Sequence, residues 1–124
     1  MPEPVTTRLD RAVIHAFRRL LKMDGRTITY QRGSNNSVII SAVVDSLDID
    51  YIEANGLKMG RIYKQFAFLT GDLTFRGVGV EPQAGDYITT GGERYDLIKI
   101  GNERIFNYDE SGGVITTVTG IKKS

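Results

Sequence analysis

Few residues in this chain of 124 have side chains suited to catalysis. His15 is the only histidine and cysteine is absent, so a Ser/His/Asp triad or a histidine metal site would depend on one residue. His15 stands between Ala12 and Arg19 in a segment with helical periodicity, where we expect a structural role. The neighbouring carboxylates Asp109 and Glu110 lie in a turn-like composition, and we expect them to be solvated.

Two glycine-rich stretches are candidates for phosphate loops. Neither Gly77-Val78-Gly79 nor Gly91-Gly92 is followed by a Lys-Ser or Lys-Thr pair or by the start of a helix, as phosphate binding requires. No paired acid and base, metal cluster or cofactor loop is recognisable in the sequence. We therefore expect no catalytic residues, no metal and no cofactor, in a protein that is not an enzyme.

The composition is that of an ordinary globular domain. Hydrophobic residues make up 40% and charged residues 25% of the chain, and its length fits one domain spanning residues 1–124. The absence of cysteine excludes disulfides and thiolate metal sites. No apolar run approaches the roughly 18 residues of a membrane span, and the N-terminus has no apolar signal segment. The sequence indicates neither secretion nor membrane insertion.

The charges are distributed unevenly, although the net charge is only +1. Residues 1–32 carry seven bases against three acids, whereas residues 45–55 carry four acids and no base. Each block is compatible with a solvated face, but the two blocks would also form complementary patches in an assembly. The candidate interface residues are Arg11, Arg18, Arg19, Lys22, Asp45, Asp48, Asp50 and Glu53.

One helix is predicted near the N-terminus. Residues 1–8 contain two prolines and no periodicity, and they are interpreted as a flexible arm. Residues 9–23 have apolar side chains three and four positions apart, which predicts an amphipathic helix whose apolar stripe contacts the core. This stripe consists of Leu9, Val13, Phe17, Leu20 and Leu21. We expect Gly25 to end the helix in a left-handed conformation.

From residue 26 the apolar period changes to two, which is typical of strands. Residues 26–32 and 38–44 are expected to pair as a hairpin around the polar turn 33–37. A long loop with short pairing is expected near residues 45–60, with a strand edge as the alternative for residues 45–55. A strand is expected at 61–69 and a loosely patterned connection at 73–80. Further strands are predicted at residues 103–108 and 113–121, within a β region that ends at 121.

The clearest turn pattern lies between Pro82 and Ile98. Gly85 and Asp86 are expected to form a bend, and Gly91-Gly92 a two-residue hairpin turn, because glycine accepts positive φ. We interpret this stretch as scaffold: Gly85, Asp86 and Gly92 set turn geometry, while Tyr95 and Ile98 fill the core.

These elements predict a mainly β fold with an N-terminal helix. Six or seven short strands separated by glycine turns are typical of a small antiparallel barrel or sandwich, and closure hides the strand edges. The helix is expected to cover one opening.

Nucleic-acid binding by a small barrel is an alternative function. Bases would stack on exposed aromatic side chains, and binding would weaken steeply with salt. The aromatic residues instead alternate as core residues do, and basic residues do not interleave with them. The aromatic candidates are Tyr63, Phe66, Phe68, Tyr87, Tyr95 and Tyr108.

The order of motifs resembles the small head-tail joining proteins of tailed bacteriophages. The helix closes at MDG, and RTITYQR, NNSVIISAVV and Asp72-Leu73 follow. The sharpest part is P-x-x-GD-x-I-x-x-x-G-x-x-Y-x-L-I from Pro82 to Ile98. The glycine-rich segment 73–80 and the residues after Gly101 fit this pattern less well, which leaves the layer of the neck open.

The resemblance implies a structural protein of the virion neck, assembled in the host cytoplasm. Its subunits would form a ring, joining or closing the DNA-filled head so that the tail can attach. Its partners would be the portal or adaptor ring and tail-end proteins, with no membrane, and a passing contact with packaged DNA is compatible with this position. A tail terminator or another tail-end protein is the alternative within the same process.

Overall fold

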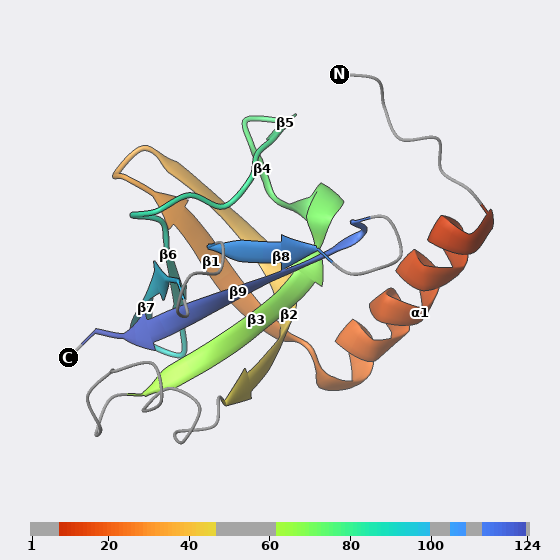
Figure 1. The fold of residues 1–124 in the computed structure, drawn as a ribbon, viewed down its shortest axis with the longest axis horizontal. Helices are drawn as coiled ribbons and strands as arrows, with labels where there is room; N and C mark the ends of the chain where they lie inside the picture. The colour runs from red at the N-terminus through yellow and green to blue at the C-terminus, as the bar shows by residue number, and fades with distance from the viewer. Residues whose placement is uncertain (1–7, 47–61, 100–104, 109–112, 124) are drawn as a thin grey trace.

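The structure is a computed structural model that describes residues 8–46, 62–99, 105–108 and 113–123. In these residues one α-helix precedes a set of short strands (Figure 1). The elements are α1 (Arg8–Asp24), β1 (Arg26–Arg32), β2 (Asn36–Ser46), β3 (Tyr63–Leu69), the 3-10 helix η1 (Thr70–Asp72), β4 (Thr74–Phe75), β5 (Val78–Gly79), β6 (Tyr87–Thr90), β7 (Glu93–Ile98), β8 (Phe106–Tyr108) and β9 (Ile115–Lys122).

Six strands close into an antiparallel barrel in the order β3-β2-β1-β6-β7-β9. The barrel closes where β3 pairs with β9 along its full length, from Tyr63 opposite Ile121 to Leu69 opposite Ile115. A seventh strand, β8, pairs with β9 at residues 116–118, next to the part of β9 that pairs with β7. The predicted mainly β fold with an N-terminal helix is therefore confirmed.

The interior of the barrel is filled by alternate residues of the strands. The period-two pattern of β1 is confirmed, because Ile28 and Tyr30 are buried while the residues between them are less so. The core cluster contains Ile28, Tyr30, Ile40, Ala42, Phe66, Phe68, Leu73, Phe75, Ile88, Tyr95, Leu97, Phe106 and Val118.

A glycine makes one part of this core possible. The rings of Phe66 and Tyr95 meet edge to face with centroids 5.5 Å apart. A Cβ atom added at Gly120 of β9 would lie 2.8 Å from the Cβ atom of Tyr95 and 3.3 Å from the ring of Phe66. The two aromatic rings therefore pack together where β9 has no side chain.

The helix lies outside the barrel, with β2 as its main contact (Figure 1). Phe17 is buried, but Leu20 is 43% and Met23 is 86% exposed. The predicted apolar stripe thus contacts the body of the protein through only part of its width, mainly at β2. That the helix covers one opening of the barrel stays a prediction. The helix begins at Arg8, one residue inside the predicted arm.

The reason for a glycine at the end of α1 differs from the prediction. Gly25 does not adopt a left-handed conformation, so that prediction is wrong. Its backbone N–H donates to the carbonyl oxygen of Leu21 at 2.8 Å, and an added Cβ atom would lie 2.3 Å from that oxygen. Gly25 is required by steric crowding as the chain leaves the helix for β1.

Among the described residues, no helix combines the length and the hydrophobicity that a membrane span needs.

Two predicted connections contain more structure than expected. β2 continues to Ser46, and its Asp45 and Ser46 pair with Gln65 and Lys64 of β3, so the predicted loop begins later than residue 45. Residues 47–60 of that loop lie outside the described residues. The connection 73–80 contains the β4–β5 hairpin. Strands of two residues are too short to produce a readable period.

The glycine turn between β6 and β7 is confirmed. Thr90 pairs with Glu93, which leaves Gly91 and Gly92 as a two-residue loop with φ of 58° and 80°. Positive φ at both positions gives a turn whose twist matches that of the flanking strands.

Candidate functional site

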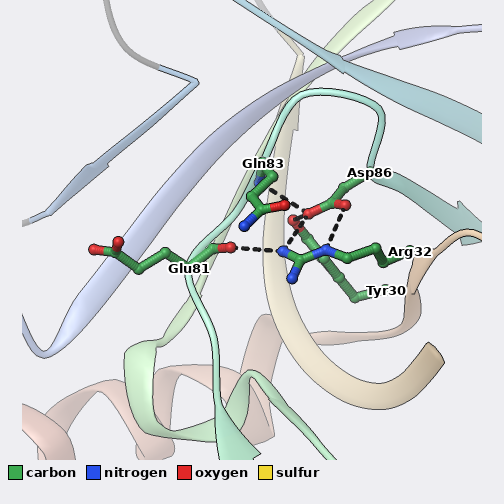
Figure 2. A network of polar contacts seen from close by, with 5 residues as sticks. All are labelled: Tyr30, Arg32, Glu81, Gln83 and Asp86. Atoms are coloured by element: carbon green, nitrogen blue, oxygen red, sulfur yellow. Dashed lines mark hydrogen bonds and ion pairs between the residues drawn. The ribbon is translucent and has the colours of Figure 1, made fainter.

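A buried carboxylate organises the turn that leads into β6 (Figure 2). Asp86 is 1% exposed, and its carboxylate accepts four hydrogen bonds. Arg32 donates through Nε to Oδ1 and through Nη2 to Oδ2, both at 2.9 Å. The Tyr30 hydroxyl donates to Oδ2 at 2.5 Å, and the backbone N–H of Gln83 donates to the same oxygen at 2.9 Å. A buried charge with this many donors is well compensated.

Arg32 extends the network to other elements. Its Nη2 also donates to the backbone oxygen of Glu81 at 2.7 Å, as Figure 2 shows. Its guanidinium lies 5.2 Å from the ring centroid of Phe75 in β4. The side chain of Glu81 in turn accepts a hydrogen bond of 2.7 Å from the hydroxyl of Tyr108 in β8. The segment 81–86 is thereby held against β1 and β8, and Arg32 also contacts β4.

The electrostatics of this network favour stability over proton transfer. Burial raises the pKa of Tyr30 far above its usual value, and the hydrogen bond to the Asp86 carboxylate raises it further. The hydrogen bond to Asp86 raises the pKa of Arg32 as well. At physiological pH Tyr30 therefore remains a neutral hydrogen-bond donor and Arg32 a cation. Because neither group changes its charge, the network stabilises the turn.

The four residues interpreted as turn scaffold lie in or beside this region. Gly85 has a φ of 95° and Gly92 a φ of 80°, and Asp86 is the centre of the network. Tyr95 is buried against Phe66. Ile98 is half-buried and lies outside the core cluster, because the alternation along β7 turns Tyr95 and Leu97 inward, so the prediction that Ile98 fills the core is wrong.

Sequence reasoning missed Arg32 and Tyr30 as partners of Asp86. A signal was present, because the period of two places Ile28, Tyr30 and Arg32 on one face of β1. A cation on the same strand face as core residues is partly removed from water, and an acidic partner compensates its charge.

All four predicted basic interface residues lie on α1 and are exposed. Arg18 and Lys22 line an open groove of about 320 Å³ between α1 and the barrel. Arg11 and Arg19 are not part of its lining. Within the described residues, none of the four forms an ion pair. The remaining groove residues are Leu21, Ser41, Leu69 and Asp72.

The predicted acidic set is described only in part. Asp45 is an exposed residue near the end of β2. Asp48, Asp50 and Glu53 lie outside the described residues.

The aromatic candidates for base stacking are mostly buried. Tyr63, Phe66, Phe68 and Tyr95 belong to the interior or are covered by other elements. The half-buried ring of Tyr87 is covered by the guanidinium of Arg94 at 3.7 Å. The statement that basic residues do not interleave with the aromatic ones is therefore wrong, because Lys64 also lies over Tyr95 and Arg32 over Phe75. These cations cover ring faces that bases would need.

Of the groups considered for catalysis, the structure describes His15. His15 is exposed on α1, and Asp109 and Glu110 lie outside the described residues. In the part of the chain that the structure describes, no group of three or more histidine, aspartate or glutamate side chains is arranged to hold a metal ion.

The family model described as phage head-tail joining protein matches residues 9–115 of the chain. This range runs from the second residue of α1 to the first residue of β9, so it contains nearly the whole helix, the Arg32–Asp86 network and eight of the nine strands that the structure describes. No curated protein matches the chain.

Proposed function

Because the chain belongs to the phage head-tail joining protein family, we propose that it closes the DNA-filled head and forms the surface to which the tail attaches. Membership of the family makes the chain a structural protein of the virion neck with head and tail components as partners. The finer proposal is one layer of identical subunits between the portal or adaptor ring and the tail-end proteins. Each subunit would be one domain, assembled in the host cytoplasm.

The observation that carries this proposal is the extent of the family match, which covers the helix and the barrel strands up to the start of β9. The physical character of the structure supports it. A closed barrel leaves no long strand edge open to aggregation, and the Arg32–Asp86 network braces the long connection before β6. A rigid body of this kind suits a protein that transmits mechanical load between two larger assemblies.

Ring formation requires two different surfaces on each subunit that fit each other, a heterologous interface closed by rotation. We propose the basic face of α1, with Arg11, Arg18, Arg19 and Lys22, as one surface. The acidic set of the neighbouring subunit, Asp45, Asp48, Asp50 and Glu53, is the other. Exposed ion pairs contribute only about 0–1 kcal/mol each, so they orient subunits without making a stable free ring. The protein alone would be monomeric or weakly associated, and it would assemble on the portal or adaptor.

The proposed function includes no catalytic step. The central network holds a turn, and the family is a structural one. Packaged DNA would pass through the ring, where contact with its phosphates would be incidental.

Electron microscopy of particles made without this protein tests the proposal. DNA-filled heads beside complete free tails are the expected result, because head filling and tail assembly would each finish independently. Tails of abnormal length would identify a tail terminator instead. Normal joined particles would contradict a joining function altogether.

A further inference from the structure

Part of strand β2 has a strand on one edge only. β1 pairs with β2 along residues 36–42, but β3, on the other edge, pairs only with residues 43–46. β3 ends at Leu69, where the chain turns away through η1. Among the described residues, no strand therefore lies on this edge of β2 at residues 37–41. Backbone N–H and C=O groups along such an edge can pair with a strand from outside.

A groove lies at this open edge, between α1, β2 and η1. Two hollows of about 320 Å³ and 340 Å³ share Ser41 and Asp72 in their lining, so they adjoin each other. Arg18 and Lys22 line the α1 side, and neither forms an ion pair with a described residue. Ile39, which is 70% exposed, lines the β2 side. Asp72 is the single acid among the described lining residues, so the groove is positively charged overall.

The geometry of the edge sets what an occupant must be. A strand added to a sheet forms backbone hydrogen bonds along the edge, and its alternate side chains face opposite sides of the sheet. At residues 37–41, the outer side of β2 carries the exposed Ile39 and Ser41 and lies toward the cations of α1. The inner side carries Ile40 of the core cluster. The occupant should therefore have acidic side chains on one face and apolar side chains on the other.

The chain itself contains a segment with this pattern. Residues 47–51 alternate apolar and acidic side chains in the order Leu47, Asp48, Ile49, Asp50 and Tyr51. As a strand, this order has one acidic face and one apolar face. The segment belongs to the block 45–55, which carries four acids and no base, so its charge is complementary to that of the groove.

The segment cannot lie along the open edge of its own subunit. Leu47 follows Ser46 directly, and Ser46 is five positions from Ser41, which is about 17 Å along a strand. The four further residues up to Tyr51 span at most about 14 Å when fully extended. The place beside residues 43–46 is already occupied by β3. The whole segment can therefore lie beside residues 37–41 only when it comes from another subunit.

We propose that residues 47–51 of one subunit add as a strand to the open edge of β2 in the next subunit. Asp48 and Asp50 would contact Arg18 and Lys22. Each subunit carries both the segment and the edge, which are two different surfaces, so the contact repeats head to tail as a closed ring requires. This inference rests on the proposed joining function, and it assigns the basic side of the subunit contact to the two groove cations.

A fluorescent peptide with the sequence of residues 45–53 tests the groove directly, by anisotropy with the purified protein. Arg18→Ala with Lys22→Ala should weaken peptide binding about tenfold or more, because both cations line the groove. Arg11→Ala with Arg19→Ala is the matched control. It removes the same charge from α1 outside the groove lining and should change binding less than about twofold. A scrambled peptide that groups the acids together should bind much more weakly, because the alternation is lost.

Disulfide formation tests whether the occupant is a second copy, since the chain has no cysteine of its own. Ser41→Cys and Asp50→Cys variants, mixed and oxidised, should give mainly dimers with one subunit of each kind. A disulfide requires Cα atoms within about 7 Å, which the added strand provides. The control replaces Ser41→Cys by Asn107→Cys, at an exposed position of β8, and should give few mixed dimers.

Several results would overturn the inference. Equal losses of peptide binding in the two double-alanine variants, or equal binding of the scrambled peptide, would show a charge attraction that does not depend on the groove. Absence of binding at about 1 mM peptide would show that the edge does not accept this segment. Mixed dimers at the level of the control would mean that a different protein occupies the groove.

The proposed function is tested separately, by adding the parent protein to DNA-filled heads and tails from particles made without it. If the parent protein joins them but does not bind the peptide, the joining function stands and the strand addition is wrong. If it binds the peptide but joins nothing, the proposed function fails while the groove keeps its ligand.

Discussion

At the scale of single residues, Asp86 has the largest structural consequence. Removing the charge of a buried acid leaves its cationic partner uncompensated, which is far more costly than the loss of an exposed pair. The chain contains both kinds of pair. The Arg32–Asp86 pair has an acid that is 1% exposed, whereas both members of the Arg94–Asp96 pair are 40% exposed.

We expect Asp86→Asn to lower the free energy of unfolding by about 2–4 kcal/mol, because Arg32 loses its counter-charge while some hydrogen bonds persist. Asp96→Asn is the matched control and should cost less than about 1 kcal/mol. Urea unfolding of both variants measures the difference. Equal costs for the two substitutions would show that the Asp86 network does not brace the barrel.

The raised pKa of Tyr30 predicts a specific pH dependence. In the unfolded chain a tyrosine loses its proton near pH 10, whereas Tyr30 in the fold keeps it to a higher pH because of burial and the Asp86 carboxylate. Stability from this group is therefore complete below about pH 10 and is lost as the pH rises further. The free energy of unfolding of the parent protein should fall above pH 10 more steeply than that of Tyr30→Phe, by about 1.4 kcal/mol per pH unit. Parallel curves from urea unfolding at pH 9–11 would refute this.

Gly120 provides a further test of the core packing. An alanine Cβ atom at this position would meet Tyr95 at 2.8 Å, so we expect Gly120→Ala to destabilise the protein by about 1–3 kcal/mol. Gly79→Ala is a matched strand control, because no atom lies within 4 Å of the added Cβ and φ is not positive. Chemical denaturation should show a change of less than about 0.5 kcal/mol for the control. A tolerated Gly120→Ala would mean that Tyr95 shifts easily.

At the scale of elements, the turns around β6 control how the barrel closes. Gly85 precedes β6, and Gly92 lies in the turn between β6 and β7. Both glycines have positive φ. β6 and β7 form the part of the barrel wall between β1 and β9, so a distorted turn at either end separates those strands from their neighbours.

Gly85→Val and Gly92→Val should each unfold or aggregate the protein, because a β-branched residue is strained at these φ values. Gly71→Val is the control, since Gly71 has neither a positive φ nor close neighbours. A thermal melt of each purified variant is the measurement. If either glycine variant melts normally but fails in assembly, the segment belongs to an interface and not to the scaffold.

At the scale of the whole molecule, the helix packs against the rest of the protein over only part of its surface. Its main contact is with β2, and it leaves Leu20, Met23 and its basic residues accessible. An amphipathic helix that is only partly covered within one subunit is available for contacts between subunits. This arrangement is compatible with the proposed ring, in which the basic face meets an acidic neighbour.

We expect Asp48→Lys with Asp50→Lys to block head-tail joining without changing the melting temperature, because like charges would then oppose each other across the interface. Adding Arg18→Glu with Arg19→Glu should partly restore joining. The assay counts joined particles, and sedimentation of the free protein at low and high salt measures its size. Normal joining by the aspartate variant, or a salt-resistant free ring, would contradict this mechanism.

Much of the fold was readable from the sequence because its signals are local. The three- and four-residue spacing from Val13 to Leu21 follows from the geometry of one helix, and the alternation of Ile28 and Tyr30 from the geometry of one strand. The turn at Gly91-Gly92 needs only positive φ at two successive residues. The short β4–β5 hairpin escaped prediction because two-residue strands have no period.

Only the tertiary structure decided which side chains meet. Arg32 and Asp86 are 54 positions apart, and no local pattern can pair them; their contact depends on β1 lying beside β6 in the barrel. The closing pair, β3 with β9, is likewise a consequence of the complete strand order. A periodic sequence determines which residues share a face, whereas long-range packing determines what that face covers. The roles of the helix and of Arg32 could therefore be recognised only in the folded structure.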